Sequence, residues 1–430
     1  MVWFFADAEP TVRAGLTLFA LIGCLWLTEA LPITMTALLV PVLAVGFGLG
    51  SPPDVLSNFA HPIIFLFLGG FSLAAAMSQH GIDRWLASRL LALAGGRAMP
   101  AALLVSLATA LLSMWISNTA TAAMMLPLAI GLMAPLGNGY PRFRLFLLLG
   151  LAWGANLGGI ATLVGSPPNA IAAAHLGWGF AEWLRVGLPL FVLLFPLALL
   201  LLWGAVRPEK NLPSLGVDKP VGFPPHRAAW QTLAIFLFTV SLWMFGRPLG
   251  AWLGIEQDFD SWVALLAIAL LAVTGTLGWH DIESRVNWGV LLLFGGGITL
   301  GAMMEQSGAS AFLAEGLQQA LSNTSPWLVY LMVALFVVLI SELVSNTASA
   351  ALLVPLFAAA AGALGIGETA VVVMIALCAS CAFMLPVATP PNAMVFGTGH
   401  VPQRRMIRCG VRLDIVCAVL IGLLVPVMMG

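Results

Sequence analysis

Ser117-Asn118-Thr119-Ala120-Thr121 and Ser345-Asn346-Thr347-Ala348-Ser349 are near copies of one polar phrase, and they decide how this chain folds. Each copy lies in the middle of an otherwise apolar stretch, and each is followed at the same distance by a proline, Pro127 or Pro355. Hydroxyl and carboxamide groups inside a membrane are costly unless they bind something. We therefore interpret the two phrases as two halves of one binding site.

The composition is that of a membrane protein. Of 430 residues, 61% are hydrophobic and only 8% are charged, with a mean hydropathy of +1.02. Soluble proteins carry about 25% charged residues. The apolar runs are long and continuous, which favours helices over the short alternating strands of a barrel. The sequence predicts an all-α polytopic protein of the plasma membrane in contact with the lipid bilayer, and its scattered basic residues give no indication of nucleic-acid binding.

The two stretches around the phrases, 98–136 and 326–362, are each predicted to be a re-entrant hairpin. Two complete crossings would need a wetter turn at the far surface than either phrase provides. A hairpin whose tip stops in the middle of the membrane fits better, and the exposed backbone of such a tip must line a cavity.

Two further apolar stretches, 142–174 and 368–399, are predicted to be discontinuous helices. The first is interrupted by Gly165-Ser166-Pro167-Pro168-Asn169 and the second by Ala388-Thr389-Pro390-Pro391-Asn392. Two consecutive prolines remove two amide donors and keep the preceding residue out of helical geometry. Each break should therefore leave backbone carbonyls free to bind a ligand.

These landmarks recur in one order, so the chain is predicted to be an internal repeat. Residues 69–73 match 296–300 at an offset of 227, the two phrases match at 228, and the two Pro-Pro-Asn breaks match at 223. The repeats would be 1–206 and 228–430, joined by a proline-containing cytoplasmic linker at 207–227. Five spans and one hairpin in each half would make the second half enter the membrane from the opposite side. Inverted repeats with broken helices are typical of secondary transporters.

The basic residues agree with this topology when the N-terminus is placed outside. Arg13, Arg185 and Arg247 then lie outside, and the other fourteen of the seventeen lysines and arginines lie on the cytoplasmic side. Such an excess of positive charge is typical of cytoplasmic loops. If either hairpin were a single crossing, every later loop would change sides.

The groups around the tips and breaks can serve a cation and an anion together. They comprise the donors Asn118, Thr119, Asn346 and Thr347, the hydroxyls of Ser113, Ser117, Ser341 and Ser345, and the free carbonyls at 165–166 and 388–389. Neutral oxygens suit an alkali cation better than a divalent one. Helix N-termini at the same place favour an anion. With no lysine or arginine placed there, bound cations would supply the positive charge, so sodium is expected to bind before the anion.

The stretch from Cys381 to Gly397, Cys-Ala-Phe-Met-Leu-Pro-Val-Ala-Thr-Pro-Pro-Asn-Ala-Met-Val-Phe-Gly, resembles the signature of a known transporter family. Both Ser-Asn-Thr phrases and the first Pro-Pro-Asn break match the same pattern. The chain thus resembles the divalent anion/sodium symporter family, which comprises solute carrier family 13 and its bacterial relatives. The resemblance covers nearly the whole chain, although family members often have one more N-terminal span than the ten counted here.

The resemblance implies a division of roles among the site residues, a homodimer, and an elevator-type motion of the hairpin-bearing domain. It implies no cofactor, only sodium as the coupling ion. The first sodium site would be Ser113, Ser117, Asn118 and Gly165. The second would be Ser341, the Val344 carbonyl, Asn346 and the Ala388 carbonyl. The substrate carboxylates would contact Asn118, Thr119, Asn346, Thr347 and Thr389, with Pro390 alongside.

The leading functional prediction is a sodium-coupled symporter of C4 dicarboxylates such as succinate, malate or fumarate. A sulfate or citrate symporter and a sodium-independent dicarboxylate exchanger stay open. A hydrolase using Ser117 or Ser345 would need a base that the first phrase lacks, so no enzyme activity is expected. A passive anion channel would not depend on a sodium gradient. Glu342, directly after Ser341, could tune a cation site, carry a proton or bond a neighbouring helix.

Overall fold

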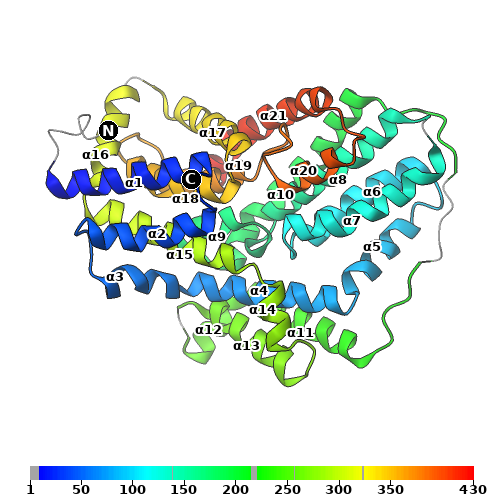
Figure 1. Ribbon diagram of the computed structural model, residues 1–430, viewed down its shortest axis with the longest axis horizontal. Coiled ribbons are helices and arrows are strands. Elements are labelled where there is room, and N and C mark those ends of the chain that lie inside the picture. Colours follow the sequence, from blue (N-terminus) through cyan, green and yellow to red (C-terminus); the bar gives the residue numbers. More distant parts are fainter. Residues whose placement is uncertain (1–8, 138, 215–219, 256, 322–323) are drawn as a thin grey trace.

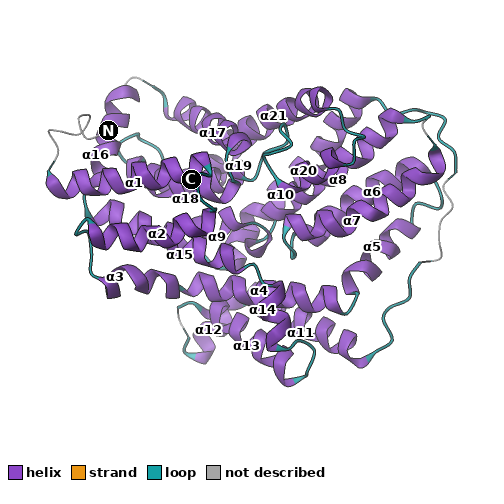
Figure 2. Cartoon of the chain, in the orientation of Figure 1, coloured by secondary structure: helices purple, strands orange, loops and turns teal. Residues whose placement is uncertain are grey.

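The computed structural model describes residues 9–137, 139–214, 220–255, 257–321 and 324–430. In these ranges the regular structure is helical, apart from one isolated β-bridge between Arg97 and Ser214 (Figure 2). Eight of the described helices are long and apolar enough to cross a membrane. The prediction of an all-α polytopic membrane protein is confirmed.

The first half of the chain contains the helices that lead to and form the first polar phrase. In order they are α1 (Pro10–Thr28), α2 (Ile33–Gly46), α3 (Pro52–Ser57), α4 (Pro62–Gln79), α5 (Ile82–Ala92), α6 (Ala98–Ser113), α7 (Asn118–Met133), α8 (Pro141–Ile160), α9 (Pro167–Leu176) and α10 (Phe180–Val206). Short 3-10 turns occupy Asn58–Ala60, Ala134–Leu136 and Leu163–Gly165.

The second half repeats this order of elements. It comprises α11 (Arg227–Met244), α12 (Gly246–Leu253), α13 (Phe259–Val273), α14 (Trp279–Arg285), α15 (Trp288–Gln306), α16 (Ala309–Leu321), α17 (Pro326–Leu343), α18 (Asn346–Ala360), α19 (Glu368–Ala379), α20 (Pro390–Gly397) and α21 (Gln403–Met429). Helix α12 follows α11 after a single residue and was not predicted from the sequence.

Equivalent helices pack in equivalent ways. Helix α4 packs on α13 as α15 packs on α2, and α8 lies between α6 and α10 as α19 lies between α17 and α21. The amphipathic helices α5 and α16 lie towards opposite ends of the long axis (Figure 1). The equivalent packing supports the internal repeat, while its inverted orientation and the side of the membrane that each end faces stay predictions.

The first helix break is closed by a single asparagine. Helix α8 ends at Ile160 and α9 begins at Pro167, whose ring cannot continue the helical hydrogen bonding. The Nδ2 atom of Asn169 donates to the carbonyls of Gly159 and Thr162, each at 2.8 Å. The amide side chain thus replaces donors that the break has removed.

The second break repeats this bridge. The Nδ2 atom of Asn392 donates to the Ala382 carbonyl at 3.1 Å and to the Leu385 carbonyl at 3.0 Å. Donor and both acceptors are displaced by 223 residues from those of the first break, which is the offset of the Pro-Pro-Asn motifs. The sequence repeat is therefore also a repeat of side-chain geometry.

The linker between the halves also holds the start of α8. The described residues of the linker between α10 and α11 are non-helical, and they include Glu209. Its carboxylate accepts the backbone N–H groups of Arg142 at 3.1 Å and Phe143 at 2.8 Å. A carboxylate at a helix N-terminus satisfies orphan donors and is favoured by the helix dipole.

Candidate functional site

One cavity of about 600 Å³ lies where both hairpin tips and both helix breaks meet. Ten of the twelve residues predicted for the site line it: Ser117, Asn118, Thr119, Gly165, Val344, Asn346, Thr347, Ala388, Thr389 and Pro390. The remaining two, Ser113 and Ser341, are fully buried directly behind the tips. The structure therefore brings the two phrases to one place, although they are 228 residues apart in the sequence.

The first tip holds its oxygen atoms close together. Ser117 is the N-cap of α7, and its hydroxyl accepts the N–H of Ala120 at 3.3 Å. The Oγ atom of Ser113 is 2.7 Å from the Asn118 Oδ1 atom and 2.7 Å from the Ala155 carbonyl oxygen. Neutral oxygens gathered in this way are the ligands that a hard cation prefers.

The second tip contains one buried oxygen atom that has no hydrogen-bond partner. The Ser341 hydroxyl donates to the Val338 carbonyl of its own helix at 2.9 Å. The Oδ1 atom of Asn346 is buried without a hydrogen-bond partner. A buried polar atom in this condition is costly unless a ligand satisfies it, so the Asn346 oxygen fits a bound cation. Among the described residues, no group of three or more His, Cys, Asp or Glu side chains could hold a metal ion.

The two breaks are joined to each other across the repeats. The Nδ2 atom of Asn156, on α8, donates to the Thr389 hydroxyl at 3.1 Å and to the Ala382 carbonyl at 3.2 Å. In the other direction, the hydroxyls of Ser166 and Ser380 are 3.2 Å apart. Asn156 was missed from the sequence, and the signal that could have found it is an amide inside a fully buried apolar helix.

Four helices begin at this cavity, so four positive dipole ends are directed at it. Their first residues, Asn118, Pro167, Asn346 and Pro390, all line its wall. Helix N-termini attract anions. No lysine or arginine belongs to the described lining, and its one carboxylate is Glu29, at the C-cap of α1. The cavity can therefore accept an anion, but full positive charge must come from bound cations.

A smaller space borders this cavity on one side. It has a volume of about 270 Å³, shares Phe71, Ser117 and Asn287 with the cavity, and extends to Asp83 and Arg285. In the predicted topology, Asp83 and Arg285 lie towards the cytoplasmic side.

Helices α15 and α18 are in close contact, and the contacting residues also line a separate cavity of about 500 Å³. A Cβ atom added at Gly297 would lie 3.2 Å from the Ala351 Cβ, and one added at Gly301 would lie 3.3 Å from the Pro355 Cβ. Small residues four positions apart allow helices in a membrane to approach this closely. At the position equivalent to Gly297 in the first half, Gly70 faces Val164 instead.

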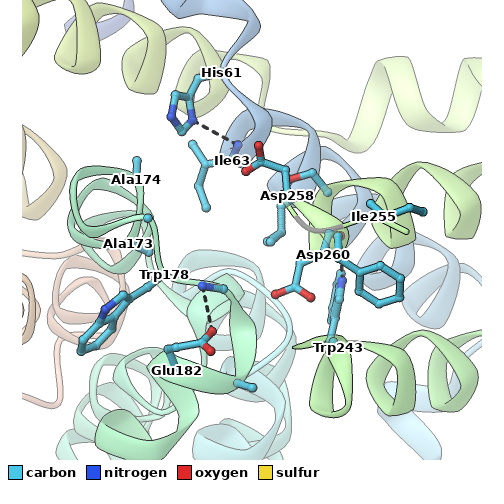
Figure 3. Close-up of a pocket in the computed structure, with 17 residues that line it drawn as sticks. His61, Ile63, Ala173, Ala174, Trp178, Glu182, Trp243, Ile255, Asp258 and Asp260 are labelled. Carbon is cyan, nitrogen blue, oxygen red and sulfur yellow. Dashed lines mark hydrogen bonds between the residues drawn. The ribbon is translucent and has the colours of Figure 1, made fainter. Parts of the chain in front are cut away.

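A second polar cavity, of about 220 Å³, lies at the predicted outer end and is not the anion site. Figure 3 shows its acidic lining, which includes Glu182, Asp258 and Asp260. The Asp260 carboxylate accepts the N–H of Phe180, the first residue of α10, at 2.6 Å. Carboxylates repel a divalent anion, and none of the predicted site residues lines this cavity.

Comparison with known sequences places this site among transporters. A sequence model of the citrate transporter family matches residues 24–377. An uncharacterized transporter of Haemophilus influenzae is 46% identical over 96% of this chain and 91% of its own length. A sodium-dependent dicarboxylate transporter, SdcS, of Staphylococcus saprophyticus is 32% identical over 94% of this chain and 84% of its own length.

Solved structures share the fold. The YdaH transporter of Alcanivorax borkumensis superposes with a TM-score of 0.60 at 17% identity, covering 87% of both chains. MtrF of Neisseria gonorrhoeae superposes with a TM-score of 0.61 at 12% identity, covering 88% of this chain and 84% of its own. At such low identity these structures support the architecture alone.

Proposed function

Because this chain belongs to the divalent anion/sodium symporter family, we propose that it couples inward sodium movement to the uptake of a C4 dicarboxylate such as succinate, malate or fumarate. The family and the relatives are transporters, so the chain is a multi-pass transporter of the plasma membrane and not an enzyme.

One observation carries the proposal: neutral donors and four helix N-termini surround a 600 Å³ cavity whose described lining has no lysine or arginine. A doubly charged anion in such a site needs counter-charge that the protein does not provide. Sodium ions at the tips supply it. Ordered binding follows, with sodium first, because the anion meets a favourable potential only after the cations are in place.

Two sodium ions would be held by oxygens of the tips and breaks. At the first tip the ligands are Ser113, Ser117, Asn118 and the Gly165 carbonyl. At the second they are Ser341, Asn346 and the carbonyls of Val344 and Ala388. The close Ser113–Asn118 oxygen pair supports the first site, and the unpartnered Asn346 oxygen supports the second.

The substrate would lie between the two tips. Asn118 and Thr119 would donate to one carboxylate and Asn346 and Thr347 to the other, with Thr389 and Pro390 at the side. A two-ended substrate fits because each tip offers the same pair of donors. The SdcS relatives, named as sodium-dependent dicarboxylate transporters, support this choice, while the description of the matching family makes citrate the second candidate.

Alternating access would proceed by the elevator-type motion, in which the hairpins and broken helices slide against the remaining helices. The unequal exposure of the two tips, with Thr119 exposed and Thr347 only 9% exposed, supports a one-sided state of such a cycle. The homodimer that the resemblance implies stays a prediction.

The test is uptake of labelled succinate into proteoliposomes with an inward gradient of either sodium or choline. We expect uptake with sodium to exceed uptake with choline at least tenfold, and unlabelled malate and fumarate to compete. Citrate and sulfate are tested as competitors in parallel. Equal uptake in sodium and choline would overturn the sodium-coupled function, and competition by citrate alone would select the second candidate.

A further inference from the structure

A buried carboxylate lies directly behind the second tip, and the proposed function assigns it no role. Glu342 belongs to the last turn of α17 and follows Ser341, and it is 1% exposed. Its Oε1 atom accepts the N–H of Met384 and its Oε2 atom accepts the N–H of Leu385, both at 2.7 Å. Both carboxylate oxygens are thus bonded to the non-helical segment between α19 and α20.

A second buried carboxyl group completes the arrangement. Asp414, on α21, is 5% exposed, and its Oδ1 atom accepts the N–H of Phe383 at 3.2 Å. Three consecutive amide groups that no helix satisfies are therefore held by carboxyls from two different helices. Hydrogen bonds to charged groups are about twice as strong as neutral ones.

This arrangement reaches the second cation site through the backbone. The Leu385 residue whose N–H is held by Glu342 also accepts, through its carbonyl, the N–H of Ala388 at 3.3 Å and the Nδ2 group of Asn392 at 3.0 Å. Ala388 supplies the carbonyl proposed as a sodium ligand. The Glu342 carboxylate thus fixes the chain whose carbonyl would bind sodium.

The first half holds its break with neutral groups. At the offset of 228 that relates the tips, Glu342 corresponds to Met114, and at the offset of 223 that relates the breaks, Asp414 corresponds to Phe191. Instead, the Thr162 hydroxyl, on the break, donates to the Met114 carbonyl, on the hairpin. In both halves the break donates and the hairpin accepts, but in the first half a side-chain hydroxyl donates to a backbone carbonyl and no carboxylate takes part.

We propose that Glu342 is a positioning residue for the second sodium site, acting through Leu385 to fix the Ala388 carbonyl, and that the first site has no charged counterpart. The inference rests on the proposed function and deepens it, since it makes the two sodium sites chemically unequal. Glu342 is assigned this role and not that of a ligand, since its two oxygens are directed at the backbone N–H groups of Met384 and Leu385. Groups that orient a metal ligand in this way change metal affinity about 10- to 100-fold when mutated.

The experiment compares wild type, Glu342→Gln and a matched control, Glu368→Gln, in proteoliposomes. Glu368 lies in the first turn of α19, with its side chain 58% exposed and paired to His175, so its amide variant removes a carboxylate far from the break. Uptake is measured against sodium concentration at saturating succinate. We expect Glu342→Gln to raise the half-saturating sodium concentration about tenfold and make the curve less steep. The maximal rate should stay within about twofold of wild type, and Glu368→Gln should match wild type.

A second readout needs no transport. Sodium, compared with choline, should raise the melting temperature of the purified wild-type protein without substrate, and Glu342→Gln should need about tenfold more sodium for the same rise. Unchanged sodium half-saturation in both assays, or a loss of folded protein and maximal rate alone, would overturn the positioning role. Absence of any sodium effect on wild type would overturn the proposed function instead, so the two failures are distinguishable.

Discussion

The two hairpin tips carry the same phrase in different surroundings. Thr119 and Ala120 at the first tip are exposed, whereas Thr347 and Ala348 at the second are 9% and 0% exposed. Ser117 caps its helix with its hydroxyl and Ser345 does not. Near-identical sequences therefore have different environments within one molecule.

The two hairpins have different neighbours. Helix α18 packs against α9, α15, α16 and α19, and together with these helices it lines a cavity of about 500 Å³. Helix α7 packs against α6, α8 and α20, and its other side borders cavities of about 270 and 480 Å³ towards α4 and α5. The conformation, and not the phrase, sets how accessible each tip is. In the opposite state of an inverted repeat the two environments should be exchanged.

The largest effect should come from removing the shared amide at either tip. We expect Asn118→Ala and Asn346→Ala each to lower succinate uptake at least about 100-fold, because each loses a sodium ligand and a substrate donor together. Uptake per folded protein, quantified by size-exclusion chromatography, checks this. Ser241→Ala, on an exposed face of α11, is the control and should transport normally. Near-normal uptake by either asparagine variant would show that the tips do not form one site.

Much of this arrangement could be predicted because prolines and polar residues stand out in apolar runs. The Pro167-Pro168 pair and the Ser117 phrase mark a break and a tip through local backbone chemistry alone. The bond from Asn156 to Thr389 could not be found in this way, since it joins residues 233 positions apart. The difference in exposure between Thr119 and Thr347 was equally hidden, because it belongs to a conformation and not to either phrase.

Locking the contact between α15 and α18 should have the next largest effect. The Gly297→Cys/Ala351→Cys pair would place its Cβ atoms about 3.2 Å apart, close to the range of disulfides. In a background with exposed Cys24 replaced by serine, we expect oxidation to lower uptake at least about tenfold and reduction to restore it. Uptake before and after oxidant, with the disulfide checked by mass spectrometry, is the measurement.

The equivalent pair in the first half is the matched control. Gly70→Cys/Ala123→Cys occupies the same positions at offsets of 227 and 228, but Gly70 now faces Val164. We expect this pair to cross-link only while sodium and succinate drive the cycle. Equal cross-linking of both pairs without substrate would contradict an exchange of environments between the halves.

The smallest expected effect is a difference in folding stability between alanine variants of the two buried serines, Ser113 and Ser341. Ser113 links α6 to Asn118 and to the Ala155 carbonyl on α8, whereas Ser341 bonds within its own helix. We expect Ser113→Ala to lower the free energy of unfolding by about 1 kcal/mol and Ser341→Ala by less. Melting temperatures in detergent without sodium give the order, and a larger loss for Ser341→Ala would contradict the bonding described.

The asparagine bridges across the two breaks also have a consequence for the ancestry of the chain. Because Asn169 and Asn392 bond to equivalent carbonyls, a gene duplication that produced the two halves would have copied the bridge with them. A single ancestral half would already have contained the broken helix. It would have lacked the hydrogen bond from Asn156 to Thr389, because that bond joins the two halves. Such a polypeptide would have had to insert in both orientations and pair with its own inverted copy to build a complete site.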